Sequence, residues 1–296
     1  MISTKLLIKL YNVYILYILK ILIGEYMQIT NSEELLNNDN IKLRGEIPKM
    51  INSNVFIHGK DNILFCEEGV TLENSRIDFH QDNSILYLSR NNHNYHVSIS
   101  LNRDSVCFIG KNNFFNGMTT VVASETKNII IGSDCLFSYN IIIRTSDGHG
   151  IYSTENKERL NHAKSIYVGD HVWFGQNSFV LKGTEIHSGS IIGAGSILSN
   201  KIIPSNVTFA GNPARLIKKN VFWTAYSTHF WGPEELKKTE KYNSDIYTFK
   251  SDDTTLNFNQ IDEDLSILSA EKSLEYILNS FHENKNRFAF INNDTI

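Results

Sequence analysis

Cysteine is scarce in this chain of 296 residues, which contains three. Cys66, Cys107 and Cys135 are scattered and odd in number, and no CxxC pair suggests a zinc site or a redox centre. We therefore expect three buried thiols in a reducing compartment. We expect Cys135 to serve packing rather than nucleophilic catalysis.

The chain also lacks an excess of positive charge. Lysine and arginine number 28 against 32 aspartates and glutamates, which gives a formal net charge of -4. There is no global basic field to attract nucleic acid or an acidic membrane surface. A local cluster must therefore hold any anionic ligand. The absence of GxxxxGK[ST] and GxGxxG loops excludes the usual nucleotide-loop recognition.

No uninterrupted apolar run is long enough to span a membrane. The most apolar stretch, residues 6–24, is interrupted by Lys9, Asn12 and Lys20, and no small-residue cleavage site follows it. Two interpretations of the first 26 residues stay open, a peripheral amphipathic anchor and a true translation start at Met27. We expect a cytoplasmic protein, associated with the inner face of the membrane at most peripherally.

An internal period of six residues is present between residues 168 and 203. Six residues suit one short strand plus a turn, and three such units close a triangular coil. Stacked coils bury a column of aliphatic side chains, whereas a strict six-residue period drifts around an α-helix. The recurring apolar positions are Val168, Phe174, Val180, Ile186, Ile192 and Leu198.

Weaker copies of the period extend the predicted solenoid over residues 50–219. Residues 1–49 then form an N-terminal extension and residues 220–296 a C-terminal one. Residues 144–165 break the period and predict a loop ejected from the coil, and long loops tend to be functional. Residues 263–284 place apolar side chains at helical spacing, which predicts an amphipathic helix that packs against or caps the solenoid. The expected fold class is all-β, a parallel β-helix.

Four segments in the middle of the chain carry a family pattern: residues 129–152 (IIIGSDCLFSYNIIIRTSDGHGIY), 168–175 (VGDHVWFG), 191–196 (IIGAGS) and 210–219 (AGNPARLIKK). In this order and spacing they resemble the hexapeptide-repeat acyltransferases. The pairing of TSDGH with GDHVWFG is most similar to enzymes that O-acetylate sialic acid, capsule and lipopolysaccharide sugars. The resemblance implies a left-handed β-helix, against the general rule for parallel crossovers, and transfer of acetyl from acetyl-CoA to a sugar hydroxyl.

The resemblance assigns His149, in the TSDGH motif, as the catalytic base. Acetyl transfer needs a base to take the proton from a sugar hydroxyl as its oxygen attacks the thioester carbonyl, and histidine suits this work near neutral pH. A surface histidine without function is the alternative. Asp147 would orient the imidazole or contact the sugar, unless it simply forms the turn before Gly148.

Trp173 is the second expected catalytic residue. In the resembling enzymes this tryptophan lines the place where thioester and acceptor meet, and its indole N–H can donate a hydrogen bond. Core packing is the alternative. We look for the oxyanion donor among the backbone N–H groups of Gly175 and Gln176. Asn116 matches the position of an acceptor-binding asparagine.

The family threads the pantetheine arm of CoA along the coils between two subunits. The matching positions are Ala194 and Ser199, with Arg215 and Lys218 as cations for the phosphates. Lys201 stands where the family's usual Thr-Lys pair is altered, which puts its role in doubt. The resemblance further implies a homotrimer with a site between subunits and a glycan or nucleotide-sugar acceptor.

Two other functions remain to be separated from this one. A γ-type carbonic anhydrase would hold zinc with three histidines across a subunit interface, but His149, His162 and His171 lack its spacing. We expect no metal. A carbohydrate-binding β-helix that has lost its activity is the non-enzymatic alternative, and the intact His149 and Trp173 motifs argue against it.

Overall fold

The computed structural model describes residues 27–38 and 40–290. The expected anchor and the alternative start concern residues 1–26, which lie outside the described residues. Within the described part of the chain, none of the helices has the length and apolar character needed to cross a membrane.

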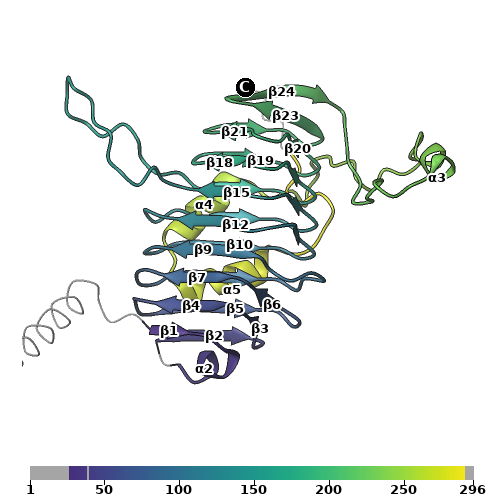
Figure 1. Cartoon of the computed structure of the whole chain (residues 1–296). Coiled ribbons are helices and arrows are strands. Elements are labelled where there is room, and N and C mark those ends of the chain that lie inside the picture. Colours follow the sequence, from purple (N-terminus) through teal and green to yellow (C-terminus); the bar gives the residue numbers. More distant parts are fainter. Residues whose placement is uncertain (1–26, 39, 291–296) are drawn as a thin grey trace, which may run out of the picture.

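Three sheets form the sides of a triangular prism (Figure 1). Face A contains β1 (Met27–Ile29), β4 (Asn54–Ile57), β7 (Arg76–Phe79), β9 (Val97–Leu101), β12 (Thr119–Ala123), β15 (Ile141–Arg144), β18 (Phe179–Leu181) and β21 (Ile197–Leu198). Face B contains β2 (Ile41–Gly45), β5 (Asn62–Cys66), β8 (Ile85–Leu88), β10 (Val106–Ile109), β13 (Ile129–Ile131), β16 (Ile166–Val168), β19 (Glu185–Ile186) and β22 (Ile202–Ile203).

Face C begins with the pair β3 (Lys49–Ile51) and β6 (Thr71–Glu73). It continues as β11 (Phe114–Phe115), β14 (Leu136–Phe137), β17 (Trp173–Phe174), β20 (Ile191–Ile192), β23 (Val207–Gly211) and β24 (Ala214–Lys219). Strands on each face pair in parallel, except that β1 runs antiparallel to β4 and β24 antiparallel to β23. The chain therefore winds from face to face as the left-handed parallel β-helix expected from the sequence.

The six-residue period is the inward-facing column of this prism. All six of its apolar residues, from Val168 to Leu198, are fully buried. Aromatic rings form a second column, in which Phe137 stacks on Phe115 and on Phe174 with ring centroids 4.9 Å apart in each case. Cys66, Cys107 and Cys135 are free and buried, as expected. Burial raises the pKa of the Cys107 thiol to about 12.

The corners of the prism explain why asparagine and aspartate recur between strands. Many corner residues have positive φ, among them Asn52, Asn74, Asn112, Asp134 and Asn177. Asparagine and aspartate tolerate this left-handed conformation better than other residues with a Cβ. The turns are therefore encoded locally, coil by coil.

The first coil begins before residue 50, because β1 and β2 already extend faces A and B. Helix α2 (Ser32–Leu36) connects these two strands and buries Leu35. The division of the chain into an extension and a β-helix domain at that residue stays a prediction.

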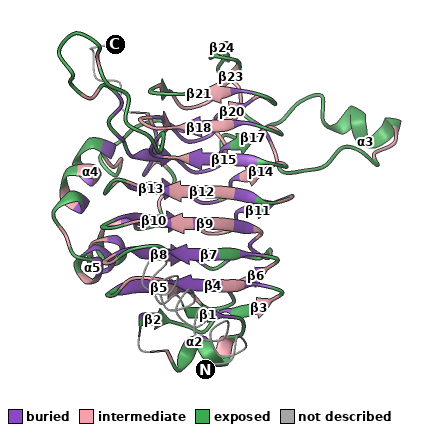
Figure 2. Ribbon diagram, turned by 60° about the vertical axis from the view of Figure 1, so that its left-hand side comes forward, coloured by how far each residue is buried: buried purple, intermediate pink, exposed green. Residues whose placement is uncertain are grey.

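The C-terminal extension turns back along the prism (Figure 2). Helix α3 (Pro233–Lys238) lies on an arm that projects from the body, whereas α4 (Phe258–Ser266) and α5 (Ala270–Ser280) pack on the outside of face B. The extension covers apolar side chains that point outward from face B: Ile63, Ile85, Tyr87, Val106, Phe108, Ile130 and Tyr167. The single helix expected over 263–284 is two helices, separated at 267–269.

Candidate functional site

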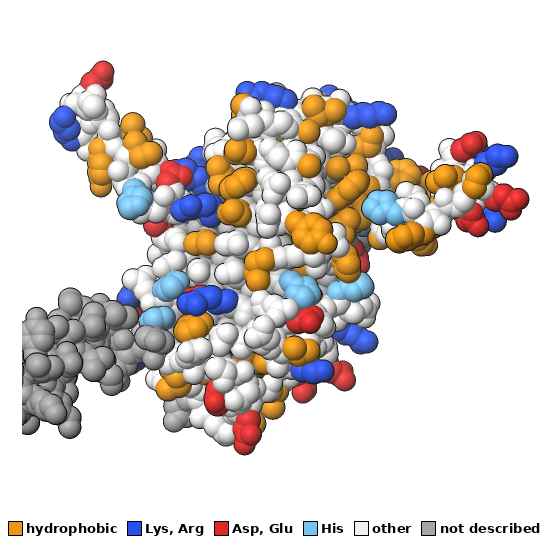
Figure 3. Space-filling model, viewed as in Figure 1, with side chains coloured by type: hydrophobic (Ala, Val, Ile, Leu, Met, Phe, Trp, Pro, Cys, Tyr) orange, Lys and Arg blue, Asp and Glu red, His pale blue; other side chains and the backbone are white. Residues whose placement is uncertain are grey.

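A cleft of about 1250 Å³ lies between face C and the C-terminal extension. Asn116 and Trp173 line it from the coils, and Trp223, Tyr226 and Tyr247 line it from the extension. Figure 3 shows apolar and histidine side chains gathered on the prism near the base of the arm that carries α3. The structure thus brings together two of the residues predicted from the sequence, Trp173 and Asn116.

Trp173 points outward from β17 because side chains alternate along a strand. Its neighbour Phe174 is fully buried, whereas Trp173 is 37% exposed. The ring centroid of Trp173 lies 6.0 Å from that of Trp223, with the planes inclined by 47°. Trp173 therefore faces the cleft and is not a core residue, which removes the packing alternative.

His171 is enclosed two residues before Trp173. Its ring is stacked between Trp223 and Tyr247, at centroid distances of 4.0 and 4.2 Å. Trp223 Nε1 donates to the His171 carbonyl at 2.9 Å, and His171 Nε2 lies 3.0 Å from the Trp223 carbonyl. Desolvation lowers the pKa of His171, which favours the neutral ring. His171 therefore fastens the extension to the turn that carries Trp173.

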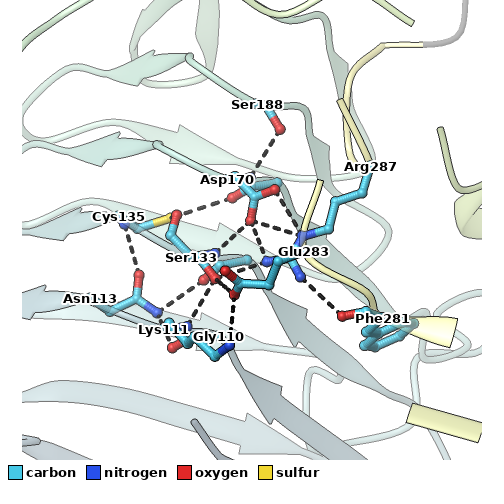
Figure 4. A network of polar contacts seen from close by, with 12 residues as sticks. Gly110, Lys111, Asn113, Ser133, Cys135, Asp170, Ser188, Phe281, Glu283 and Arg287 are labelled. Carbon is cyan, nitrogen blue, oxygen red and sulfur yellow. Dashed lines mark hydrogen bonds and ion pairs between the residues drawn. The ribbon is translucent and has the colours of Figure 1, made fainter. Parts of the chain in front are cut away.

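A buried ion pair fastens the same turn from the other side (Figure 4). Arg287 donates to both carboxylate oxygens of Asp170, with Nη2 at 2.7 Å from Oδ1 and Nε at 2.9 Å from Oδ2. Arg287 also donates to Ser133 Oγ at 2.8 Å and to the Phe281 carbonyl at 3.2 Å. Nearly every donor of this guanidinium thus has a partner inside the protein.

His149 lies elsewhere in the chain. Its loop, residues 145–165, leaves the corner between faces A and B, which is the edge of the prism opposite face C. In Figure 1 this loop and the arm with α3 extend to opposite sides. His149 is exposed and does not line the cleft that contains Trp173. One chain therefore does not bring the two expected catalytic residues together.

The base of the loop is held by Asn161, which the sequence analysis did not identify. The Asn161 amide nitrogen donates to Asp147 Oδ2 at 2.8 Å and to the His149 carbonyl at 2.7 Å, and its Oδ1 accepts from Ile151 N at 2.7 Å. Lys182 Nζ lies 2.5 Å from the Asp147 carboxylate. The hydrogen bond from Lys182 is the main cause of the lowered pKa of Asp147. Asp147 thus anchors the loop, and these contacts fix the backbone at His149.

The positions expected to bind CoA fall into three places on one chain. Gly175, Gln176 and Ala194 share the corner between faces C and A, where a Cβ on Gly175 would lie 2.4 Å from Ala194 N. Ser199 and Lys201 lie on the corner between faces A and B, two coils beyond the loop of His149 toward the C-terminal end of the prism. Arg215 and Lys218 are exposed on β24.

The backbone of Gly175 is engaged in the coil. Its N–H donates to the Ile192 carbonyl at 2.7 Å, so it is not free to stabilise an oxyanion. Gln176 remains the candidate for this donor. A glycine is required at position 175 because the next coil approaches its Cα so closely.

The zinc alternative depends on the rings of His149, His162 and His171. Across the described ranges, no three histidine, cysteine or acidic side chains are grouped so that they could hold a metal ion. His171, one of the three histidines that such a site would use, has its ring enclosed between Trp223 and Tyr247.

Known proteins share sequence and fold with this chain. No family model matches the chain. The polysialic acid O-acetyltransferase of Neisseria meningitidis is 32% identical over 166 residues, which are 56% of this chain and 76% of that protein. The polysialic acid O-acetyltransferase of Escherichia coli O1:K1 / APEC is 34% identical over 133 residues, 43% of each chain, so the match spans less than half of that relative.

A solved structure extends the match over more of the chain. The polySia-specific acetyltransferase NeuO is 29% identical, with a TM-score of 0.54 over 66% of this chain and 93% of that chain. The sequence match, the shared fold and the hexapeptide coils agree with one another. The chain belongs to the hexapeptide-repeat O-acetyltransferases, the family that includes the polysialic acid O-acetyltransferases.

Proposed function

We propose that the protein transfers an acetyl group from acetyl-CoA to a hydroxyl of a cell-surface sugar, with His149 as the general base. The imidazole takes the proton of the hydroxyl as its oxygen bonds to the thioester carbonyl carbon. The tetrahedral intermediate then expels the CoA sulfur as a thiolate, and the imidazolium gives its proton to that sulfur. The products are an acetyl ester and free CoA.

We further propose that each site is built by two chains. The supporting observation is the separation of the two residues on one prism: His149 is on the loop at the edge between faces A and B, and Trp173 is on the opposite face C, with both side chains open to solvent. A neighbouring chain could place its projecting loop over Trp173, and a threefold ring closes this head-to-tail contact without leaving a free end. The homotrimer suggested by the resemblance fits this requirement.

The same assembly would complete a path for acetyl-CoA. The corner with Gly175, Gln176 and Ala194 belongs to one chain of each pair. The corner with Ser199 and Lys201 would come from the other chain, because it lies on the same edge of the prism as the loop that carries His149. The pantetheine arm would run between them, and Arg215 and Lys218 on the last hairpin would meet the phosphates.

The test of the base is His149→Ala, with His162→Ala as its matched control in the same loop. His162 is also exposed. We expect His149→Ala to lower kcat by roughly 100- to 10,000-fold, with the melting temperature and the affinity for CoA unchanged, because the side chain points into solvent in the isolated chain. His162→Ala should keep its activity. Release of free CoA, followed with a thiol reagent, measures both. A His149→Ala variant as fast as the parent would refute the mechanism.

A further inference from the structure

We infer that the cleft between face C and the C-terminal extension, defined above by Trp173, Asn116, Trp223, Tyr226 and Tyr247, binds the acceptor as an uncharged glycan. This inference rests on the proposed function and adds the chemical class of the acceptor. It is of interest because the two relatives described above are named for a polyanionic sugar chain.

The walls of the cleft suit the apolar faces of sugar rings. Trp173 and Phe114 lie on face C, and Tyr226 and Tyr247 line the opposite side from the extension. Trp223 supports this side from beneath, because it is 7% exposed and its ring stacks on His171. Aromatic side chains offer large rigid surfaces, and ligand sites typically combine them with a few polar groups. Tyr226 is 66% exposed, so its ring is available for contact with a ligand.

The charges of the cleft do not favour an anion. Among the described residues that line it, Lys285 and Arg287 are the two with a lysine or arginine side chain. Arg287 is committed to Asp170, and Lys285 Nζ donates to the Asp245 carbonyl at 2.6 Å. Carboxylate sugars are normally held by such cations. Here three acidic residues of the lining, Asp134, Asp170 and Glu283, outnumber the two cations, so the lining does not favour a sialic acid.

Besides Asp170, two acidic groups line the cleft, and one of them is paired with a lysine. Asp134 and Glu283 line it, and Glu283 lies 3.5 Å from Lys111 Nζ in an ion pair open to solvent. The uncharged lining residues Asn116 and Ser138 provide an amide and a hydroxyl of the kind that hydrogen-bond sugar hydroxyls. An uncharged acceptor therefore matches the cleft better than a polyanion does.

Contacts with the coils hold the aromatic residues of the extension in place. The stacking of His171 between Trp223 and Tyr247 fixes two of the aromatic residues, and the pair of Arg287 with Asp170 fixes the end of the segment that follows. Acceptor selection is thus assigned to residues 223–247, whereas the base belongs to the loop of residues 145–165.

A binding experiment on the full-length protein tests the inference without relying on catalysis. Quenching of tryptophan fluorescence is titrated with a panel of neutral hexose and N-acetylhexosamine oligosaccharides, and separately with sialic acid oligomers. We expect saturable binding of a neutral glycan, with a Kd that hardly changes between about 50 and 500 mM salt because no charges are screened. Tyr226→Ala should raise that Kd roughly tenfold.

Phe230→Ala is the matched control, because Phe230 is an aromatic residue of the same arm, is 95% exposed and does not line the cleft. It should bind the neutral glycan as the parent does. Preferential binding of sialic acid oligomers, no binding of any neutral glycan, or equal effects of the two variants would each overturn the inference. Acetyl-CoA binding is measured in parallel, and its absence would instead refute the proposed function.

Discussion

At the scale of single residues, the position of His149 depends on hydrogen bonds made by other side chains. Its imidazole is on an exposed loop, yet the backbone around it is fixed by Asn161 and by the Asp147–Lys182 pair. A mobile base would spend part of its time away from the hydroxyl. Small displacements of a catalytic group lower the rate of the chemical step. Asn161 is therefore a residue that positions His149.

Asn161→Ala removes the hydrogen bonds to Asp147 and to the His149 carbonyl, and it should lower kcat by roughly tenfold. The KM for acetyl-CoA and the melting temperature should hardly change, since Asn161 holds the loop and not the coils. Asn156→Ala is the control, because Asn156 lies in the same loop and bonds Glu158, away from His149. Steady-state kinetics of both variants check this, and equal kcat values for the two would contradict the positioning role.

Protonation of His187 makes the free energy of unfolding depend on pH. It is buried beside Phe258, and desolvation lowers its pKa to about 4. In the unfolded chain its pKa is near 6.5, so between these values the unfolded state binds more protons and the free energy of unfolding falls as pH falls. From pH 7 to pH 5 we expect this side chain to account for a loss of about 2 kcal/mol.

Denaturant unfolding at the two pH values measures the loss. His187→Phe should make the protein less sensitive to acid, whereas His282→Phe, at an exposed position, should leave the sensitivity as it is. An unchanged acid sensitivity in His187→Phe would assign the effect to other groups, such as the buried His171, whose pKa is also lowered.

At the scale of elements, several contacts attach the C-terminal extension to the coils: apolar contacts on face B, the stacking of Trp223 and Tyr247 on His171, and the buried ion pair between Arg287 and Asp170. Arg287→Met would leave the Asp170 carboxylate buried without its partner. We expect a loss of about 3–5 kcal/mol in the free energy of unfolding. Adding Asp170→Asn should recover part of this loss, because the uncompensated charge disappears.

The matched control for this pair is Arg103→Met. Arg103 lies 3.1 Å from Asp82 in an exposed ion pair, and such pairs contribute at most about 1 kcal/mol. Denaturant unfolding compares the variants. A cost for Arg287→Met no larger than that for Arg103→Met would show that the buried pair does not hold the extension.

The elements also differ in how far the sequence predicts them. The coils follow from the six-residue period because each coil repeats the same local pattern of an inward apolar residue and a tight turn. The two helices of the extension carry a weaker helical pattern, and their separation near Ser269 was not predicted. The ejected loop was predicted because residues 144–165 interrupt a regular period.

At the scale of the whole molecule, the candidate site was predicted in part. His149, Trp173 and Asn116 could be identified because each lies within or beside a short sequence motif. The side of the cleft formed by the extension was not predicted. Trp223, Tyr247 and Arg287 contact residues of the coils that are far away in the sequence. Arg287 and Asp170, for example, are 117 residues apart. No local pattern records a contact of this kind.

In the site that we propose, one chain supplies His149 and its neighbour supplies Trp173. Co-expression of the His149→Ala and Trp173→Ala chains, each inactive alone, tests it most directly. In a trimer of 33.8 kDa chains that contains both variants, one of the three sites would combine an intact histidine with an intact tryptophan, about a third of the sites. We expect acetyl transfer to reappear at this level in the purified mixed trimer. Mixed trimers that stay as inactive as either variant alone would contradict a site shared between chains.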